Sequence, residues 1–580
     1  MIPSLLQDPF KDILISSPSE QSIEQFMLKN EFYSWVPANG TFENKEMMNA
    51  IASNFSVFNE VGRPLFHRFT NKCLGYSPEI ANQIFDKSGD FISNGGWATG
   101  YSQLVRFGFN RSEATDDHGP ANEVIRCKKQ YDLNLRGFRL NDQGKFVFNA
   151  NIFVRYALTR MRLAILYATG EYYIYHQSGV WKNIREEQLG KLLRDILHEA
   201  DPNIWKKKYQ TEYLAAIKLE ANYIEELNPY NHFININNGM FDIRSFAIKK
   251  HSPDYYSTIR LPVNYDESAT CPKFMKFLSD VFEDDQERIN LIQEAIGVGM
   301  SLENKLQEAF FFFGTGSNGK STLINVITHL FGKENIASVS LSSLCGRFGF
   351  QNLPNKIANF STENELTSIH TQNFKAITGN DSVEIERKHK DSYTAKLFCT
   401  LYLLFNTLPD TKDFSYAYFR RICLIPFNVS FSRNERNTNL EQELLEELDG
   451  IFMFALEGLK RLISNNYQLT SSSVSKAALS QYQLGQNPTI EFFDDCLEIA
   501  EGDSIRQPDV HKTFIEWARI RGYDRWWNLS SQRFWDLLRP VMKENGIDLD
   551  TKKVQGTIYI NDIRLKGTHQ TNSNMVPLSY

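Results

Sequence analysis

The chain has 580 residues, which is too long for one hydrophobic core and predicts three or four domains. It is 42% hydrophobic and 23% charged, a composition that excludes an intrinsically disordered protein. A formal net charge of −6 excludes a protein that coats nucleic acid with its whole surface, but it leaves room for local basic sites. No apolar run approaches the roughly 18 residues of a membrane helix, and the amino end has no basic leader. We therefore expect a cytoplasmic protein with no membrane partner.

The first half of the chain predicts two domains that precede the main motifs. Residues 1–150 mix short apolar clusters with turn signals and show no clear period, so their pattern assigns no role. Residues 151–270 alternate strand-like and helical stretches, which predicts a mixed domain. A helical stretch over 271–285 then opens a third domain, which we place at 271–470.

The segment around residue 314 carries the clearest motif in the chain. Four consecutive phenylalanines before it predict a buried strand, and apolar residues at i, i+4 and i+7 predict a helix after it. The loop between them fits G-x-x-x-x-G-K-[ST] without a mismatch. The residues that would surround the phosphates of a nucleotide are Gly314, Thr315, Gly316, Ser317, Asn318, Gly319, Lys320, Ser321 and Thr322.

The chemistry of this loop follows from its residue types. Glycines let backbone N–H groups wrap the phosphates, which also lie at a helix N-terminus, where the dipole favours anions. Lys320 would reach the β- and γ-phosphates, and the hydroxyl of Ser321 would ligate magnesium. The loop predicts a nucleotide site and does not by itself predict hydrolysis.

Two later strand-like runs end in polar residues that nucleotide hydrolysis requires. The run 356–363 ends in Glu363, with Glu365 two residues on, and the next apolar run ends at Asn406. A carboxylate at a strand end can hold magnesium or orient water, and an amide can hold the attacking water. Each of these alone is more often a strand that runs into a solvated loop. The order of loop, carboxylate, amide and an arginine-bearing strand at 419–427 favours the catalytic interpretation.

A basic cluster lies between the carboxylates and the amide. Arg387, Lys388, His389 and Lys390 stand side by side between two strand-like runs, which predicts a hairpin with a basic tip. An isolated charge cluster is usually a solvated turn. The neighbouring motifs favour a role for this one.

Taken together, these motifs resemble the superfamily III helicases, the ring-forming AAA+ replicative helicases of small DNA viruses, phages and plasmids. The similarity is greatest to the phage and plasmid primase–helicase branch and covers about residues 155–567. It implies an α/β fold in several domains: helical or mixed N-terminal domains, a central P-loop ATPase with a parallel sheet, and a C-terminal winged helix. It also implies a hexameric, ATP- and Mg²⁺-dependent DNA helicase that moves 3′ to 5′ on single-stranded DNA and starts replication of a mobile genetic element.

The resemblance also implies roles for the residues of the nucleotide site. Lys320 and Ser321 match the Walker A pair, Glu363 the Walker B acid that holds Mg²⁺ with Ser321, and Asn406 the sensor asparagine. There is one departure, because many relatives carry two adjacent acids where this chain has Glu363 and Glu365 separated by an asparagine. Which carboxylate serves magnesium and which serves water therefore stays open.

Further roles concern the neighbouring subunit and DNA. Arg421 matches the finger arginine that reaches into the nucleotide of the next subunit, and Arg420 is a second candidate. Lys388 and His389 lie where the family places a pair that grips the DNA backbone inside the ring, and Lys375 belongs to the same motif.

The last domain, residues 488–567, predicts a DNA-binding module. Helices expected over 491–500, 511–520 and 530–543, followed by a two-stranded wing near 551–560, indicate a winged helix that binds duplex origin DNA. The basic side chains expected to face phosphates are Arg533, Arg539, Lys543, Lys552 and Lys553. A packing or oligomerisation domain is the alternative.

Other interpretations stay open. The chain could be an origin-binding initiator that uses ATP only as an assembly switch. A small-molecule kinase or GTPase is a second rival, which leaves the basic hairpin and the last domain unexplained. Residues 1–150 keep an unassigned role, for which a degenerate primase and a collar are candidates, and host replication proteins are candidate partners.

Overall fold

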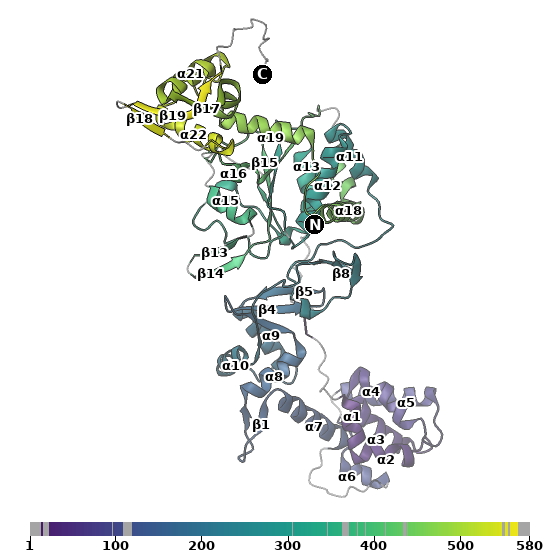
Figure 1. Ribbon diagram of the computed structural model, residues 1–580. Coiled ribbons are helices and arrows are strands. Elements are labelled where there is room, and N and C mark those ends of the chain that lie inside the picture. Colours follow the sequence, from purple (N-terminus) through teal and green to yellow (C-terminus); the bar gives the residue numbers. More distant parts are fainter. Residues whose placement is uncertain are drawn as a thin grey trace. The chain divides into compact units, whose positions relative to one another are not determined.

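The chain divides into two compact units, residues 1–177 with 182–226 and residues 178–181 with 227–580 (Figure 1). The computed structural model describes residues 13–14, 22–94, 97–107, 109, 119–303, 305–344, 346–361, 371–379, 381–388, 390–411, 413–432, 437, 439–547, 551–554 and 557–566. Across these ranges, no helix has the length and apolar character needed to span a membrane.

The first unit begins with short helices packed around aromatic side chains. They are α1 (Ile23–Lys29), α2 (Glu31–Asn39), α3 (Lys45–Ser56), α4 (Asn59–Thr70), α5 (Pro78–Ser93), α6 (Tyr101–Leu104) and α7 (Gly119–Leu135). Edge-to-face ring contacts hold the core, such as Tyr33 with Phe55 at 5.1 Å between centroids. Prolines lie inside α2 and α4, where each removes a backbone donor from the helix, so these short helices depend on their packing.

The first unit continues as a mixed α/β region. A hairpin of β1 (Phe138–Leu140) and β2 (Phe146–Phe148) leads into α8 (Ala150–Arg160), β3 (Leu163–Leu166), β4 (Glu171–His176), β5 (Val180–Ile184), α9 (Glu186–His198), α10 (Lys207–Glu220) and β6 (Asn222–Ile224). The larger sheet has the order β5-β4-β3-β6, with β3 antiparallel to β4 and parallel to β6. The alternation of strands and helices predicted after residue 150 is confirmed.

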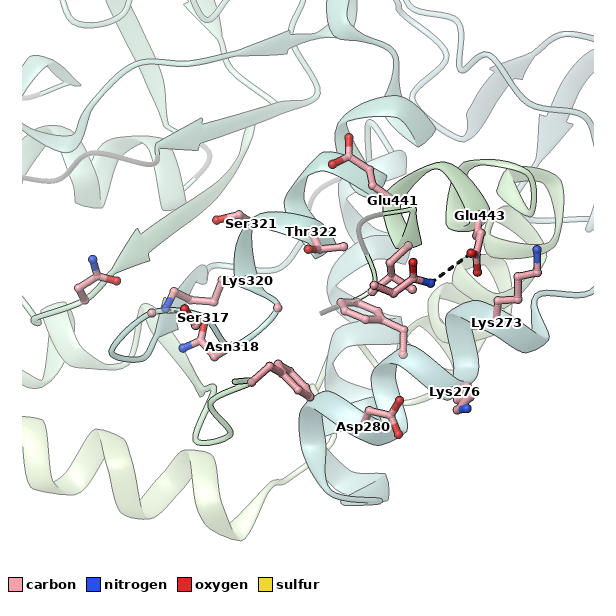
Figure 2. Close-up of a pocket in the computed structure, with 17 residues that line it drawn as sticks. Lys273, Lys276, Asp280, Ser317, Asn318, Lys320, Ser321, Thr322, Glu441 and Glu443 are labelled. Atoms are coloured by element: carbon pink, nitrogen blue, oxygen red, sulfur yellow. Dashed lines mark hydrogen bonds between the residues drawn. The ribbon is translucent and has the colours of Figure 1, made fainter. Parts of the chain in front are cut away.

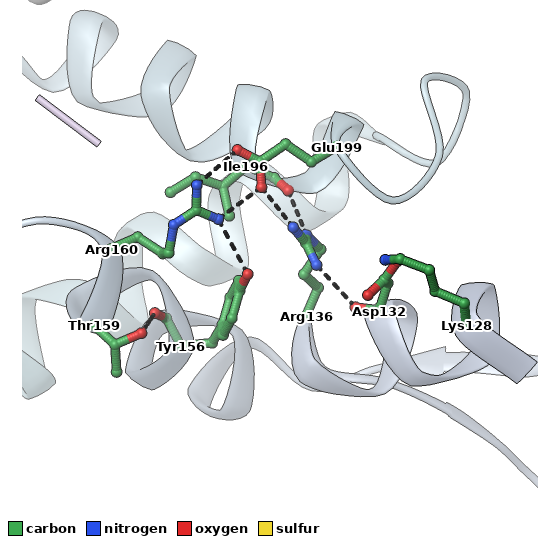
Figure 3. Close-up of polar contacts among 8 residues, drawn as sticks. All are labelled: Lys128, Asp132, Arg136, Tyr156, Thr159, Arg160, Ile196 and Glu199. Carbon is green, nitrogen blue, oxygen red and sulfur yellow. Dashed lines mark hydrogen bonds and ion pairs between the residues drawn. The ribbon is translucent and has the colours of Figure 1, made fainter. Parts of the chain in front are cut away.

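Two buried arginines tie α7 to this mixed region. Arg136 donates to the Ile196 carbonyl at 2.6 Å and to the Glu199 carboxylate, and Arg160 donates to the same carboxylate at 2.7 and 3.0 Å (Figure 3). Both guanidinium groups lie near the ring of Tyr156. The two cations hold the pKa of Glu199 below its usual value despite its partial burial. The ends of α7, α8 and α9 are therefore fixed at one point.

The second unit opens with a small sheet and two helices. Strands β7 (Phe233–Ile236), β8 (Gly239–Asp242) and β9 (Ala247–Lys249) form an antiparallel sheet. It precedes α11 (Pro272–Phe282) and α12 (Gln286–Met300). The unit therefore begins before the boundary predicted at residue 270.

A five-stranded parallel sheet forms the centre of the second unit. Its order is β11 (Ile336–Ala337), β12 (Ala358–Ser361), β15 (Thr400–Phe405), β10 (Ala309–Phe313) and β16 (Ile422–Pro426). Strand β10 is the predicted phenylalanine strand, and its residues are largely buried because β15 and β16 flank it. The helix predicted after the loop is α13 (Lys320–Phe331). The strand predicted within 356–363 is confirmed over Ala358–Ser361 as β12.

Further helices surround this sheet. They are α14 (Leu341–Leu344), α15 (Thr371–Thr378), α16 (Tyr416–Phe419), α17 (Leu440–Leu445), α18 (Leu448–Ser464) and α19 (Ser473–Gln486). A second hairpin, formed by β13 (Ser382–Arg387) and β14 (Lys390–Lys396), projects between α15 and β15 in the chain. This hairpin was predicted from the two strand-like runs around the basic cluster.

The C-terminal part corrects one predicted element. It contains α20 (Thr489–Cys496), β17 (Leu497–Arg506), α21 (Gln507–Ile520), α22 (Ser531–Glu544), β18 (Thr551–Val554) and β19 (Thr557–Leu565). The helix predicted over 491–500 is wrong beyond Cys496, because Leu497 pairs with Leu565 and starts a strand. Apolar residues at 497 and 499 suit either a helix or a strand, and the distant β19 decides the outcome.

Gly297 on α12 and Gly458 on α18 let the two helices pack backbone to backbone. This close packing generates a prediction for the stability of the fold. A Cβ on Gly458 would lie 2.4 Å from the Gln293 carbonyl oxygen, so Gly458→Ala should destabilise the fold by about 1–3 kcal/mol. Gly485→Ala is the matched control, because no atom lies within 4 Å of the new Cβ on α19. Urea unfolding of the two variants should show a loss of stability for Gly458→Ala alone, and equal midpoints would contradict the packing.

Candidate functional site

The glycine-rich loop that begins at Gly314 lies at the carboxyl end of β10, where the chain turns into α13. Gly316 and Gly319 have φ values of +108° and +85°, which residues with side chains rarely adopt. The Gly314 amide donates to the Phe405 carbonyl at 3.1 Å, and the Phe431 amide donates to the Ser317 carbonyl at 2.8 Å. The loop is therefore held by backbone bonds on both sides.

Lys320 is a buried cation whose hydrogen-bond partners among the described residues are neutral. Its Nζ donates to the Gly314 carbonyl at 2.5 Å and to Asn318 Oδ1 at 3.1 Å. Burial lowers the pKa of this ammonium, because no carboxylate compensates for the loss of water. An anion that enters the loop would supply the missing charge. Lys320 is therefore placed to attract phosphate.

A pocket of about 900 Å³ opens beside this loop, and its lining includes residues 316–322. Figure 2 shows Lys320 and Ser321 at the start of α13 and Asp280 on a separate helix across the pocket. Phe277 and Phe431 add aromatic surface to the lining. This volume accommodates a nucleotide-sized ligand, with a polar loop for phosphates and aromatic rings for a base.

The opposite wall was not predicted from the sequence. The lining residues that sequence reasoning missed are Lys273, Lys276, Phe277, Asp280, Phe431, Asn437, Leu440, Glu441 and Glu443. Lys273, Lys276 and Asp280 follow helical spacing on α11, which is a detectable signal. The same spacing is typical of any solvated helix face, so nothing distinguished this one.

Asn406 lies directly after β15 and also lines the pocket. Strand β15 neighbours β10, and the strands are parallel, so Asn406 and the loop lie at the same edge of the sheet. Strand β12 ends at Ser361 on the far side of β15, at that same edge. The predicted acids Glu363 and Glu365 lie outside the described residues.

The two candidate finger arginines lie at the other edge of the sheet. Arg421 precedes β16, and its carbonyl accepts from the Ala309 amide at 2.8 Å at the start of β10. Arg420 donates to Gln307 at 3.0 Å. The length of β10 separates them from the loop, roughly 15 Å at 3.3 Å per residue. The structure therefore does not bring Arg420 or Arg421 into the pocket of their own chain.

Arg421 itself is only partly satisfied. Its Nη1 donates to the Ala417 carbonyl, whereas its Nε is buried and has no hydrogen-bond partner among the described residues. Burial lowers the pKa of this guanidinium, and the neighbouring charge of Arg420 lowers it further. Asp381 and Asp413 oppose that effect.

The basic cluster lies at the turn of the β13–β14 hairpin. Lys388 is exposed there, whereas the guanidinium of Arg387 lies 4.8 Å from the centre of the Tyr393 ring. Lys390 is also exposed, and His389 lies outside the described residues. Arg347 pairs with Glu386 at 2.6 Å, just before the turn. Among the described members of the cluster, Lys388 has the clearest access to a ligand.

Lys375 occupies a different environment. Its ammonium pairs with the Asp413 carboxylate and lies 3.3 Å from Ser415 Oγ, at side-chain exposures of 28% for Lys375 and 18% for Asp413. The pair joins α15, which leads into the hairpin, to the segment that leads into Arg421. The expectation that Lys375 binds DNA stays a prediction, and the ion pair gives it a second explanation.

Two regions of the chain match known families. Residues 150–283 match the family described as D5 N terminal like, and residues 312–421 match a family of unknown function, DUF5906. The second match begins in β10 and ends at Arg421, so it contains the loop, Asn406 and the hairpin.

Several viral proteins are similar to this chain in sequence. The chain is 27% identical over 232 residues to "Putative helicase 121R" of Invertebrate iridescent virus 3, which covers 37% of this chain and 24% of that protein. It is 22% identical over 363 residues to "Putative helicase 184R" of Invertebrate iridescent virus 6, at 54% and 37% coverage. The chain thus spans about a quarter to about a third of the length of these relatives. The matches support a phage or viral primase–helicase family.

A solved structure has a distantly similar backbone. The A form apo structure of the NrS-1 C terminal region is 14% identical, with a TM-score of 0.42, and covers 69% of this chain and 97% of that one.

The Lys375–Asp413 pair generates a prediction that separates DNA contact from internal positioning. We expect Lys375→Asp and Asp413→Lys each to lower the thermal stability of the protein, because each leaves two like charges together. The double reversal should restore part of it, since it restores the ion pair but not the bonds that Asp413 accepts from Ser415. Thermal unfolding of the three variants measures this effect.

The salt dependence of DNA binding provides the contrasting outcome. If Lys375 contacted phosphate, Lys375→Ala would flatten the log–log salt slope of single-strand binding by roughly 0.7, and Asp413→Asn would not reproduce that change. With a positioning role, both variants keep the wild-type slope.

Proposed function

We propose that this chain is an ATP-dependent DNA helicase that works as a ring and starts replication of a mobile genetic element. Its D5 N terminal like region and its similarity to viral proteins named as helicases support a helicase-like replication role. The finer resemblance, to the replication initiators of staphylococcal pathogenicity islands, is part of this proposal.

One observation carries the proposal: the loop and the arginines occupy opposite ends of the neighbouring strands β10 and β16. Phe313 pairs with Pro426 at one end, and Ala309 pairs with Ile422 at the other. A catalytic site that contains both Lys320 and Arg421 therefore requires two copies of the chain, one for each edge. This geometry favours a closed ring, and a hexamer is the form that the resemblance implies.

The strand order supports an AAA+ core. Strand β15, with Asn406 at its end, lies between the loop strand β10 and β12, which leads toward Glu363. The parallel arrangement brings the ends of all three strands to one edge. The phosphate loop, the amide and the segment that carries the acids can thus act on one nucleotide.

The residues present fit ATP with magnesium. Glycine backbone at 316 and 319 leaves N–H groups for phosphate oxygens, and Lys320 would pair with the β- and γ-phosphates. Ser321 and Glu363 would hold Mg²⁺, which shields phosphate charge when bound. Asn406 would position the attacking water, and Arg421 from the neighbouring subunit would stabilise charge that develops on the phosphoryl oxygens.

The hairpin supplies the proposed grip on single-stranded DNA. Lys388 is exposed at its turn, while Arg387 packs on Tyr393 and stiffens the strand below. One such turn from each subunit would line a ring with positive charge, although the chain is acidic overall. Translocation from 3′ to 5′ is the direction that the resemblance implies.

The C-terminal elements support a winged helix that binds duplex origin DNA. The order α20-β17-α21-α22-β18-β19 places a strand between the first two helices and a hairpin after the third. Arg539 and Lys543 are exposed one turn apart on α22. Arg533 is also exposed, and its guanidinium lies 5.3 Å from the Phe414 ring. The expectations for the side chains of Lys552 and Lys553 fall outside the described part of the chain.

The rival functions differ in what they leave unexplained. An initiator that uses ATP only as an assembly switch needs Arg421 at the edge of the sheet opposite the loop, but it needs no hairpin that grips DNA. A small-molecule kinase needs neither the hairpin nor the C-terminal domain. The hairpin thus favours the motor.

Mixing two inactive variants tests whether the arginine acts across subunits. Arg421→Ala should bind ATP but lose roughly a thousandfold in turnover, because charge on the phosphoryl oxygens is no longer stabilised. Mixed with Lys320→Ala protein, it should recover activity at interfaces where an intact loop meets an intact Arg421. Arg420→Ala, tested in the same way, shows which arginine is the finger. Absence of recovery in rings that exchange subunits would contradict the proposal.

A second variant tests the hairpin. Lys388→Ala combined with His389→Ala should retain basal ATP turnover, lose most DNA stimulation and lose fork unwinding, because the ring no longer grips the backbone. Lys396→Ala is the matched control, since this exposed lysine lies on β14 away from the turn. If the double variant unwinds forks as the wild type does, the turn is a solvated loop and the motor assignment loses its support.

A further inference from the structure

The β1–β2 hairpin of the first unit exposes apolar side chains at its end. Leu140 pairs with Phe146 in the register, and their exposures are 52% and 44%. Val147, which follows on the other face, is 53% exposed. No described residue covers this end, although three such side chains together are unfavourable in water.

Ring contacts join the base of this hairpin to the start of α10. The Tyr209 ring lies 5.6 Å from Phe138 and 4.6 Å from Phe148, centre to centre. Lys206 Nζ lies 5.6 Å from the centre of the same ring. The lysines that begin α10 are therefore neighbours of the hairpin.

The two elements together form a basic surface, which we call the hairpin–α10 surface. Its cations are Lys206, Lys207 and Lys208 at the start of α10 and Lys145 in the hairpin turn, all exposed. Only Lys208 has a carboxylate partner among the described residues, Glu212 at 3.6 Å. The hairpin itself carries one acid, Asp142 in the turn, so the cations of this surface outnumber its acids.

The placement of these lysines opposes the stability of their own helix. Lys206 is the N-cap of α10, Lys207 and Lys208 follow it, and the first turn contains no acidic residue. The positive end of a helix dipole disfavours cations at this position. Folding gains nothing from three lysines here, which favours a role in binding an anion.

The surface is also rigid. Arg136 immediately precedes the hairpin and is fixed by its bonds to the Ile196 carbonyl and the Glu199 carboxylate (Figure 3). In the hairpin turn, the Asn141 side chain accepts from the Gln143 and Lys145 amides at 3.1 and 2.9 Å. Cations on such a scaffold lose little conformational freedom when they bind a ligand.

We propose that the hairpin–α10 surface is a second binding site for single-stranded DNA, separate from the β13–β14 hairpin of the second unit. The cations would contact successive phosphates, and the exposed Phe146 ring would stack on a base. The combination of unpaired cations with an exposed aromatic ring fits a single strand better than a duplex, whose bases are already stacked. The proposal goes beyond the motor function, because this site needs no nucleotide.

The test is the salt dependence of binding by the full-length protein to fluorescent oligo-dT without nucleotide. The triple variant Lys206→Ala/Lys207→Ala/Lys208→Ala should flatten the log–log slope by up to about 2, at roughly 0.7 per lost contact. Phe146→Ser should weaken binding roughly tenfold with an unchanged slope. A matched control, Lys45→Ala/Lys72→Ala/Lys87→Ala, removes three exposed lysines elsewhere in the first unit and should behave as the wild type.

Each outcome decides the proposal. A wild-type slope for the Lys206–Lys208 variant, or an equal effect of the control, overturns it. Weakened duplex binding with unchanged oligo-dT binding also overturns it, in favour of a duplex site. The same flattening is expected in a Lys320→Ala background. Absent ATP turnover in the wild type would thus refute the motor function and leave this result standing.

Discussion

The parallel direction of the five central strands is the constraint on which the rest of the structure depends. Every strand has its carboxyl end at the edge that holds Lys320 and its amino end at the opposite edge. Because β16 pairs with β10 along its length, the ladder that holds the loop strand also fixes Arg421 at the far edge. Under the proposed function, such a chain would carry half of a catalytic site at each of two edges, and assembly and catalysis would become a single requirement.

The cations around the β13–β14 hairpin differ in their contacts within the chain. Lys375 is paired with Asp413, and Arg387 packs on Tyr393. Lys388 remains exposed at the turn. An acidic chain can thus reserve a few cations for phosphate and use the others to connect the hairpin to the arginine edge.

The sequence predicted the features that short-range chemistry determines. The loop over 314–321 needs glycine, lysine and serine at fixed spacing, so its strand and helix could be predicted around it. The Lys375–Asp413 pair could not be predicted, because its members are far apart in sequence and meet only when α15 packs beside the segment before α16. Strand β17 was missed for a similar reason, since its pairing with β19 overrides a pattern that also suits a helix.

Strand displacement on tailed forks tests the central claim most directly. Wild-type protein with ATP and Mg²⁺ should unwind a fork that has a 3′ single-stranded tail and leave a 5′-tailed duplex intact. Lys320→Ala protein should unwind neither, because the phosphates lose the buried cation that pairs with them. ATP turnover without displacement of any tailed substrate would contradict the motor and favour an initiator that uses ATP to assemble.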